Sequence, residues 1–224
     1  MSETIKIAID GPAGSGKSTL AKALSASLGY VYVDTGAIYR TVGLYAAING
    51  ISPDDEVTLS SRFDDIKINL EWKTDGQHIY LNGNDVSDKI RTPEASMYAS
   101  AVSALPSVRG FLLQMQREIA DRENVIMDGR DIGTVILPDA QVKIFMKADP
   151  EVRAKRRFTE LTQKGKTVTY QEVYDDMVLR DKNDSTRLTA PCVPADDAVI
   201  FDNSEFDESQ TLSHALSIVK ERLK

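Results

Sequence analysis

The sequence predicts an α/β fold of three layers, with a five-stranded parallel sheet between two layers of helices. Short apolar runs and amphipathic stretches alternate along most of the chain, which is the pattern of a parallel sheet with helices on both faces. A glycine-rich segment joins the first apolar run to the first helix. A short stretch with a different period interrupts the alternation after residue 62. We therefore expect a single domain, residues 1–224, whose core comprises 1–62 and 92–224.

The expected core strands are short runs rich in Val, Ile and Tyr, which favour strands. They are residues 4–9, 30–33, 125–127, 142–146 and 198–201. Between these runs, apolar residues recur at helical spacing. This spacing predicts helices over 17–28, about 37–48, from 92 onward, 106–122 and about 209–223, with a loop at 49–55.

Residues 63–91 are expected to form a small antiparallel β insertion. The stretch 66–72 alternates apolar and polar residues, as a half-buried strand does. A second strand is expected at 77–81, with a hairpin signal at Asn82-Gly83 and a third strand at 85–87. The insertion is either a structural appendage or a unit that closes over an acceptor.

The glycine-rich segment Asp10–Thr19 contains Gly-x-x-x-x-Gly-Lys-Ser, which is the P-loop pattern. Glycines let successive backbone N–H groups turn inward around an anion, and a helix that begins near Lys17 points its positive end at the same place. Lys17 can reach the β- and γ-phosphates, and the Ser18 hydroxyl can bind Mg²⁺. Strand, glycine-rich turn and helix together indicate a P-loop NTPase-type fold that binds nucleotide phosphates.

Residues 151–187 are expected to form a helical lid. Charged residues recur there at helical spacing in two groups, Arg153, Arg156 and Arg157 in the first and Arg180, Asp184 and Arg187 in the second. Such spacing is typical of solvated helices with Arg–Asp pairs. Downstream of a P-loop it also suits a hinged helix pair that brings cations to a transferred phosphoryl group.

Composition excludes several classes of protein. The net charge is −7, whereas binding a nucleic acid polymer requires a basic face. Cys192 is the single cysteine, so no intramolecular disulfide forms and a reducing compartment is indicated. The first residues lack an apolar signal core, and no 18-residue apolar run occurs. We expect a cytoplasmic protein with neither a membrane nor a nucleic acid polymer as partner.

Four segments together resemble the bacterial cytidylate kinase family, the (d)CMP kinases of the nucleoside monophosphate kinase superfamily. They are DGPAGSGKST at 10–19, DTGAIYR at 34–40, DGRDIGT at 128–134 and RDKNDSTR at 180–187. The stretch APCVPADDA at 190–198 also fits. The resemblance spans about residues 4–203, insertion included. Ile38 stands where the family more often has Met, which replaces one apolar residue by another.

The resemblance implies ATP-dependent, Mg²⁺-assisted phosphorylation of CMP and dCMP to CDP and dCDP by a monomer. The residues implied for ATP binding are Gly11, Pro12, Ala13, Gly14, Ser15, Gly16, Lys17, Ser18 and Thr19. The catalytic cations implied are Lys17 and Arg130 together with Arg153 and Arg157 of the lid. Ser18 is the implied metal ligand.

The resemblance also implies the acceptor site. The acceptor phosphate would be bound by Arg40, Arg130 and Arg187, the cytosine by Ser100, Arg109 and Asp131, and the sugar by Arg180 and Asp184, with Thr35 beside the acceptor. The chemistry is consistent, because a carboxylate accepts from the cytosine amine but would face a carbonyl of uracil with no proton between them. Asp34 and Asp128 also end strands beside the P-loop, and either one orients Mg²⁺ or serves structure alone.

Two other functions compete with this interpretation. Another P-loop kinase, with a small molecule or a different nucleotide such as UMP or AMP as acceptor, would share the first half of the sheet. The set of arginines favours an acceptor that already carries a phosphate. A regulatory GTPase is disfavoured, because neither Asp-x-x-Gly nor Asn-Lys-x-Asp occurs in the sequence.

Overall fold

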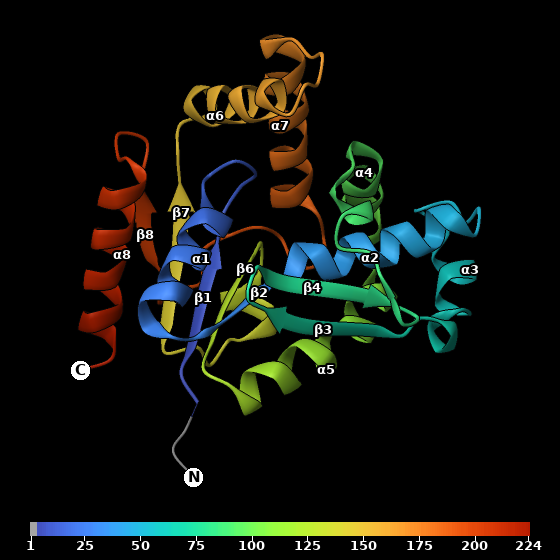
Figure 1. Cartoon of the computed structure of the whole chain (residues 1–224), viewed down its shortest axis with the longest axis horizontal. Helices are drawn as coiled ribbons and strands as arrows, with labels where there is room; N and C mark the ends of the chain where they lie inside the picture. The colour runs from blue at the N-terminus through green and yellow to red at the C-terminus, as the bar shows by residue number, and fades with distance from the viewer. Residues whose placement is uncertain (1–3) are drawn as a thin grey trace.

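The structure is a computed structural model that describes residues 4–224, and its centre is a parallel sheet in the order β2-β6-β1-β7-β8 (Figure 1). The strands are β1 (Lys6–Asp10), β2 (Val31–Asp34), β6 (Val125–Gly129), β7 (Val142–Lys147) and β8 (Val199–Asp202). Every pairing between them is parallel, so the prediction of a five-stranded parallel sheet is confirmed. β1 lies in the middle, and the P-loop therefore starts from a fully buried strand.

Helices cover both faces of this sheet because successive strand residues point to opposite sides. Ile7 and Ile9 pack with α1 (Lys17–Leu28) and α8 (Glu208–Arg222). Ala8, between them in β1, belongs to the core on the other face, with α2 and α5. That face carries α2 (Thr35–Ile48), α4 (Pro93–Val102) and α5 (Pro106–Arg122).

Three local differences from the expected elements have simple causes. α2 begins at Thr35, two residues early, because the Asp34 carboxylate accepts from the Ala37 N–H at 2.9 Å and caps the helix. A short helix that the sequence analysis did not predict, α3 (Glu56–Ser60), is capped in the same way by Asp55. The segment after β6 forms one π-helical turn, Ile132–Ile136.

The insertion forms the expected antiparallel unit. It comprises η1 (Phe63–Asp65), β3 (Ile68–Lys73), β4 (Gly76–Leu81), β5 (Asn84–Asp85) and η2 (Lys89–Arg91). The third strand ends at 85 and not at the predicted 87, because the Asp85 side chain accepts from the Ser87 N–H in a local turn. The β3–β4 hairpin lies beside β2, at the edge of the central sheet (Figure 1).

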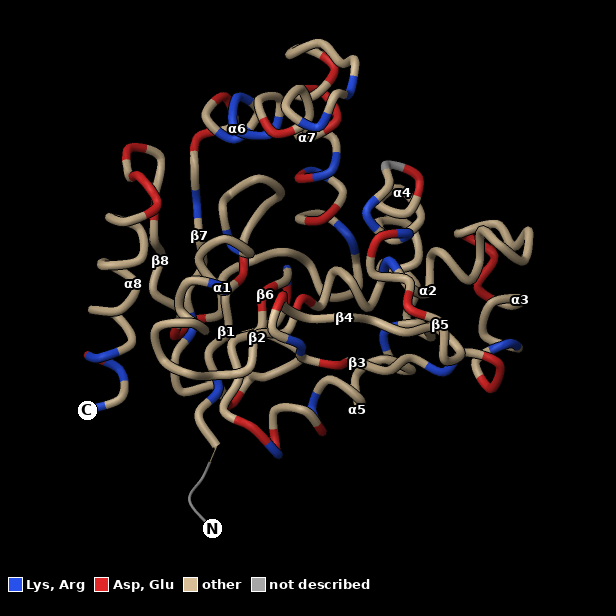
Figure 2. Tube along the Cα trace, in the orientation of Figure 1, with Lys and Arg blue, Asp and Glu red and all other residues tan. Residues whose placement is uncertain are grey.

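The expected helix pair is α6 (Pro150–Gln163) and α7 (Tyr170–Thr186), which lies across the carboxyl end of the sheet in Figure 1. The two helices share a small apolar core around Ala154, Val173 and Met177. Thr169 and Glu172 form a reciprocal capping box at the start of α7. Figure 2 shows acidic and basic residues interspersed along the pair. Within residues 4–224, no helix is both long enough and apolar enough to cross a membrane.

The crossing of α2 and α4 is close because α2 carries Gly43 at the contact. A Cβ at residue 43 would lie 2.8 Å from the Cβ of Tyr98 and 3.1 Å from the backbone N of Ala99. These distances are shorter than ordinary carbon contacts, so the glycine sets the separation of the two helices. α2 also carries Arg40, about one turn earlier.

We expect Gly43→Ala to lower the free energy of unfolding by about 1–3 kcal/mol, because the added methyl group must push α4 away. Gly110→Ala is the matched control: it is also helical, but its Cβ would meet nothing within 4 Å. That change should raise stability by about 0.4–1 kcal/mol. Urea unfolding followed by circular dichroism compares the two. Equal stability of both variants would contradict the close crossing.

Candidate active site

The P-loop is held in a conformation that only glycine adopts readily. Gly11, Gly14 and Gly16 have φ values of +144°, +71° and +88°. A Cβ on Gly11 would lie 2.3 Å from the carbonyl oxygen of Met146 in β7, so no other residue fits there. α1 begins directly afterwards at Lys17 and directs its first N–H groups into the loop. The loop therefore has the geometry of a phosphate site.

Lys17 is buried in this loop, with 5% of its surface exposed. Its ammonium donates to the Pro12 carbonyl oxygen at 2.7 Å and to the Ser15 hydroxyl at 3.4 Å. Burial lowers the pKa of Lys17 to about 7, and the guanidinium of Arg130 adds to the lowering. A phosphate would supply the negative charge that this ammonium needs, so the donor set fits a polyphosphate.

The Ser18 hydroxyl donates to one carboxylate oxygen of Asp128 at 2.8 Å, and the Tyr32 hydroxyl donates to the other at 2.8 Å. Hydroxyl and carboxylate oxygens are the ligands that Mg²⁺ uses in phosphate sites, where it also keeps waters and substrate oxygens. Asp34 is engaged elsewhere, with the Ala37 N–H and Arg40. Of the two aspartates that the sequence offered for Mg²⁺, Asp128 is therefore the one beside Ser18. No group of three or more metal-binding side chains occurs within residues 4–224.

Charged residues from three elements lie close together in a second group. Asp131 accepts from Arg109 of α5 and lies 3.6 Å from Arg187 at the end of α7. Asp184 of α7 accepts from Arg130 at 2.8 Å and lies 3.9 Å from Arg187. Burial raises the pKa of Asp131, while Arg109 and Arg187 favour its ionised form. Five of the residues implied for the acceptor thus form one connected cluster.

Arg40 of α2 is oriented by Asp34, which accepts from its Nη2 at 2.8 Å. The Nε of Arg40 is buried and has no hydrogen-bond partner within residues 4–224. A buried donor without a partner is costly, and an anion next to it would remove that cost. The Arg40 side chain is therefore suited to binding a phosphate.

The remaining predicted residues are placed less centrally. Thr35 is buried, and its hydroxyl donates to the Asp128 carbonyl oxygen at 2.7 Å. Ser100 is half-buried on α4, and within residues 4–224 its side chain makes no hydrogen bond to the charged cluster. Arg180 pairs with Asp176 at 3.0 Å, and Arg157 pairs with Glu160 at 2.7 Å on the surface of α6. The structure does not bring these last two arginines into the cluster.

Comparison with known proteins identifies the family. A model of the cytidylate kinase family matches residues 7–221. The cytidylate kinase of Fervidobacterium nodosum is 49% identical over 221 residues, which are 98% of each chain. That of Caldicellulosiruptor bescii is 48% identical over 214 residues, covering 96% of this chain and 95% of its own. The chain belongs to the cytidylate kinase family.

A solved structure of an uncharacterized protein from Eubacterium ventriosum is similar over 98% of this chain and 99% of its own, with 14% identity and a TM-score of 0.52. This likeness supports the fold alone. The family resemblance inferred from the four sequence segments is confirmed by the full-length match. The individual roles of the residues in this member of the cytidylate kinase family stay predictions.

One residue that the sequence analysis missed joins α6 and α7 to the P-loop. Asp181 of α7 accepts from the Ala13 N–H at 3.2 Å and from Arg153 at 2.5 Å. Arg153 also donates to the Ala13 and Ala148 carbonyl oxygens, and 4% of its surface is exposed. These contacts attach α6 and α7 to the loop. Asp181 stands four residues after Met177, where the buried stripe of α7 continues, and a charge at such a position was the available signal.

Two other missed residues support the site. Tyr39 is buried beneath Arg109, whose guanidinium carbon lies 5.5 Å from the ring centroid. Asn203 donates to the Ser15 carbonyl oxygen at 3.1 Å, and its own carbonyl oxygen accepts from Arg156 at 2.9 Å. Arg156 thus secures the loop after β8. No local pattern in the sequence distinguishes these contacts.

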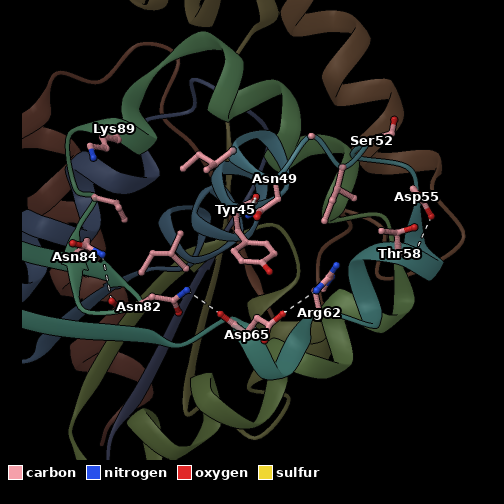
Figure 3. A pocket seen from close by; sticks show the side chains of 15 residues that line it. Tyr45, Asn49, Ser52, Asp55, Thr58, Arg62, Asp65, Asn82, Asn84 and Lys89 are labelled. Carbon is pink, nitrogen blue, oxygen red and sulfur yellow. Dashed lines mark hydrogen bonds and ion pairs between the residues drawn. The ribbon is translucent and has the colours of Figure 1, made fainter.

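A separate cavity of about 670 Å³ lies where the end of α2, α3 and the β4–β5 turn meet (Figure 3). Tyr45, Arg62, Asp65 and Asn82 are among its lining residues. None of the residues predicted for nucleotide binding lines it. The cavity therefore lies apart from the residues predicted to bind nucleotides in this cytidylate kinase family member.

The lowered pKa of Lys17 predicts proton uptake when ATP binds. The pKa of about 7 in the folded protein lies below the ordinary 10.5, so Lys17 loses its proton on folding when the pH lies between these two values. The free energy of unfolding therefore falls as the pH drops from 10.5 towards 7. Phosphate charge reverses this preference. At pH 8 we expect binding of ATP to take up about one proton per site. Calorimetry in two buffers of different ionisation enthalpy measures this number.

Lys17→Met is the control for this measurement, because it removes the titrating group and keeps an unbranched chain of similar length. Uptake should disappear in the variant. An apparent binding enthalpy that is the same in both buffers for the unaltered protein would contradict the prediction.

Proposed function

We propose that this protein transfers the γ-phosphoryl group of ATP to CMP and dCMP, and forms CDP and dCDP. The observation that carries the proposal is the pair of facing sites at the carboxyl end of the sheet. A P-loop with a buried lysine lies opposite a connected cluster of arginines and aspartates. Membership of the cytidylate kinase family supports CMP as acceptor. The alternative of a UMP, AMP or unrelated acceptor is not favoured.

On the donor side, the residues from Gly11 to Thr19 bind the phosphates of ATP. The backbone N–H groups of the loop surround the β-phosphate, and Lys17 neutralises charge between the β- and γ-phosphates. We further propose that Ser18 and Asp128 hold Mg²⁺, which supplies charge neutralisation at the phosphates when it is bound. Tyr32 keeps the Asp128 carboxylate in place by donating to it.

On the acceptor side, Arg40, Arg130 and Arg187 bind the phosphate that becomes the nucleophile. Phosphoryl transfer of this kind requires positioning and charge stabilisation and no covalent protein intermediate. Arg130 is the link between the two sides, because it lies close enough to Lys17 to lower the pKa of that residue. It is thus placed between donor and acceptor, where negative charge spreads over the transferred group.

The cytosine is read by Asp131 with Arg109 and Ser100, and the sugar by Arg180 and Asp184. Asp131 accepts from the N4 amine, and Arg109 donates to the acceptors of the ring. The pairing of Arg109 with Asp131 supports this assignment, since it fixes the position of each group relative to the other. Among residues 4–224, the side chains of Ser100 and Arg180 make no hydrogen bond or ion pair with the cluster, so their proposed roles rest on the family resemblance.

We also propose the organisation in which this chemistry takes place. One kinase domain has its core in 1–62 and 92–224, an acceptor-side insertion at 63–91 and a lid at 151–187. Arg153 and Arg157 act from the lid, Arg153 by fixing the P-loop through Ala13. The protein acts as a monomer in the cytoplasm on small-molecule nucleotides.

A panel of acceptors tests the function. Purified protein is given ATP and Mg²⁺ with CMP, dCMP, UMP, AMP or shikimate, and formation of ADP is measured. We expect CMP and dCMP to give the highest kcat/KM. Preference for AMP, UMP or shikimate would establish the alternative kinase. Release of ADP that no acceptor stimulates would exclude both.

Changing Asp131 to Asn tests the reading of the base. The variant keeps the size of the side chain but offers an N–H that can face the uracil carbonyl, so the ratio of kcat/KM for CMP over UMP should fall by about 10-fold or more. Acceptor kinetics with both nucleotides measure this ratio. KM for ATP and the unfolding temperature serve as controls for a general defect. An unaltered ratio in a folded variant would refute the role of Asp131.

A further inference from the structure

The outer edge of β2 has no neighbouring strand in the central sheet, yet its outward polar groups are bonded. The Tyr32 carbonyl oxygen accepts from the indole Nε1 of Trp72 at 2.7 Å. The Asp34 N–H donates to the Oε1 of Gln77 at 2.9 Å. In a parallel sheet one residue of an adjacent strand would make both of these bonds. Two side chains of the insertion thus replace a sixth strand.

Trp72 and Gln77 act as a pair because of the hairpin register. They face each other across β3 and β4, next to the turn at residues 74–75. Directly opposed residues of an antiparallel pair project from the same face of the sheet. The pair therefore presents one donor and one acceptor side by side, which is what the edge of β2 requires.

Asp34 connects this contact to Arg40 of the proposed acceptor site. Its N–H is held by Gln77, one carboxylate oxygen caps α2 at the Ala37 N–H, and the other accepts from Arg40 at 2.8 Å. The buried Nε of Arg40 has no hydrogen-bond partner within residues 4–224, and a phosphate would supply one. A displacement of Asp34 would displace this guanidinium.

The hairpin is only partly packed against the core at this end. A cavity of about 610 Å³ lies between it and the end of α1, and Trp72 and Gln77 line it together with Asp34 and Gly29. Trp72 is 43% exposed. With a cavity in place of apolar contacts, the two hydrogen bonds to β2 determine where the hairpin end lies relative to Asp34.

We propose that Trp72 and Gln77 are positioning residues for the acceptor: they hold the edge of β2 so that Asp34 presents Arg40 to the acceptor phosphate. The proposal rests on the proposed function and gives the insertion a defined role in it. The insertion contributes to acceptor binding without touching the acceptor through these two residues. The sequence left two roles open for the insertion, a structural appendage and closure over an acceptor, and this proposal assigns it a functional role.

Gln77→Leu tests the proposal. The variant keeps the bulk of the side chain but removes the acceptor for the Asp34 N–H. Loss of one such hydrogen bond should raise KM for CMP by about 3–10-fold, with KM for ATP unchanged. Isothermal calorimetry with CMP alone should show Kd weakened by the same factor. A general loss of stability would instead affect ATP and CMP alike.

Three further variants separate the contact to β2 from the integrity of the hairpin. His78→Leu removes bonds to Asp75 and Asp85 within the hairpin and should leave KM for CMP unchanged. Gln77→Glu keeps an acceptor oxygen and should restore most of the affinity. Trp72→Phe removes only the indole N–H and should weaken CMP binding in the same direction as Gln77→Leu. If Gln77→Leu fails to fold, Trp72→Phe is used in its place.

Unchanged Kd and KM for CMP in folded Gln77→Leu and Trp72→Phe would overturn the proposal, as would an equal effect of His78→Leu. The proposed function fails in a different way. If the unaltered protein forms no CDP from ATP and CMP, the function itself is refuted. If the unaltered protein is active and the variants match it, only the positioning role is lost.

Discussion

Carboxylates at the ends of three strands hold the site together. A carboxylate that has left water needs hydrogen bonds or a counter-charge, and each of these aspartates obtains them from a segment with a role in the chemistry. Asp10 ends β1 and accepts from the Ile132 and Gly133 N–H groups at 2.8 and 2.7 Å. Burial raises its pKa to about 6 despite these bonds. Asp128, next to the last residue of β6, accepts from Ser18 of the P-loop, while Asp34 ends β2 and accepts from Arg40. Donor and acceptor sites are thereby fixed to the carboxyl end of the sheet.

The acceptor cluster illustrates why buried ion pairs indicate function more than stability. Arg109, Arg130 and Arg187 face two carboxylates, Asp131 and Asp184, so the cluster keeps a net positive charge. Removing five charges from water costs free energy, and the attraction within buried ion pairs seldom exceeds this desolvation penalty. A phosphate is the partner that would balance the cluster. Its geometry is fixed before any ligand arrives, which lowers the entropy lost on binding.

Sequence reasoning predicted the site unevenly. The P-loop and the strands of the insertion were predicted, because each of these patterns lies within about ten residues of sequence. The residues of the acceptor cluster were named from family resemblance and not from local physics. Spacing on α7 placed Arg180 on one helix face with Asp184 and Arg187, yet Arg180 pairs with Asp176 in the structure. Helical spacing gives the face of a helix and leaves its rotation against neighbours undefined.

The sequence by itself determined the elements: five short apolar strands, a glycine-rich loop between the first strand and the first helix, and the residue types that phosphate chemistry requires. Those features follow from backbone sterics and from periodicity, both of which act over a few residues. Tertiary structure alone decided the strand order, the meeting of Asp131 with Arg109, and the closure of the β2 edge by Trp72 and Gln77. These contacts join residues that are 22 to 43 positions apart. Such partners are selected by the packing of whole elements on a common core, and no short pattern in the chain records that choice.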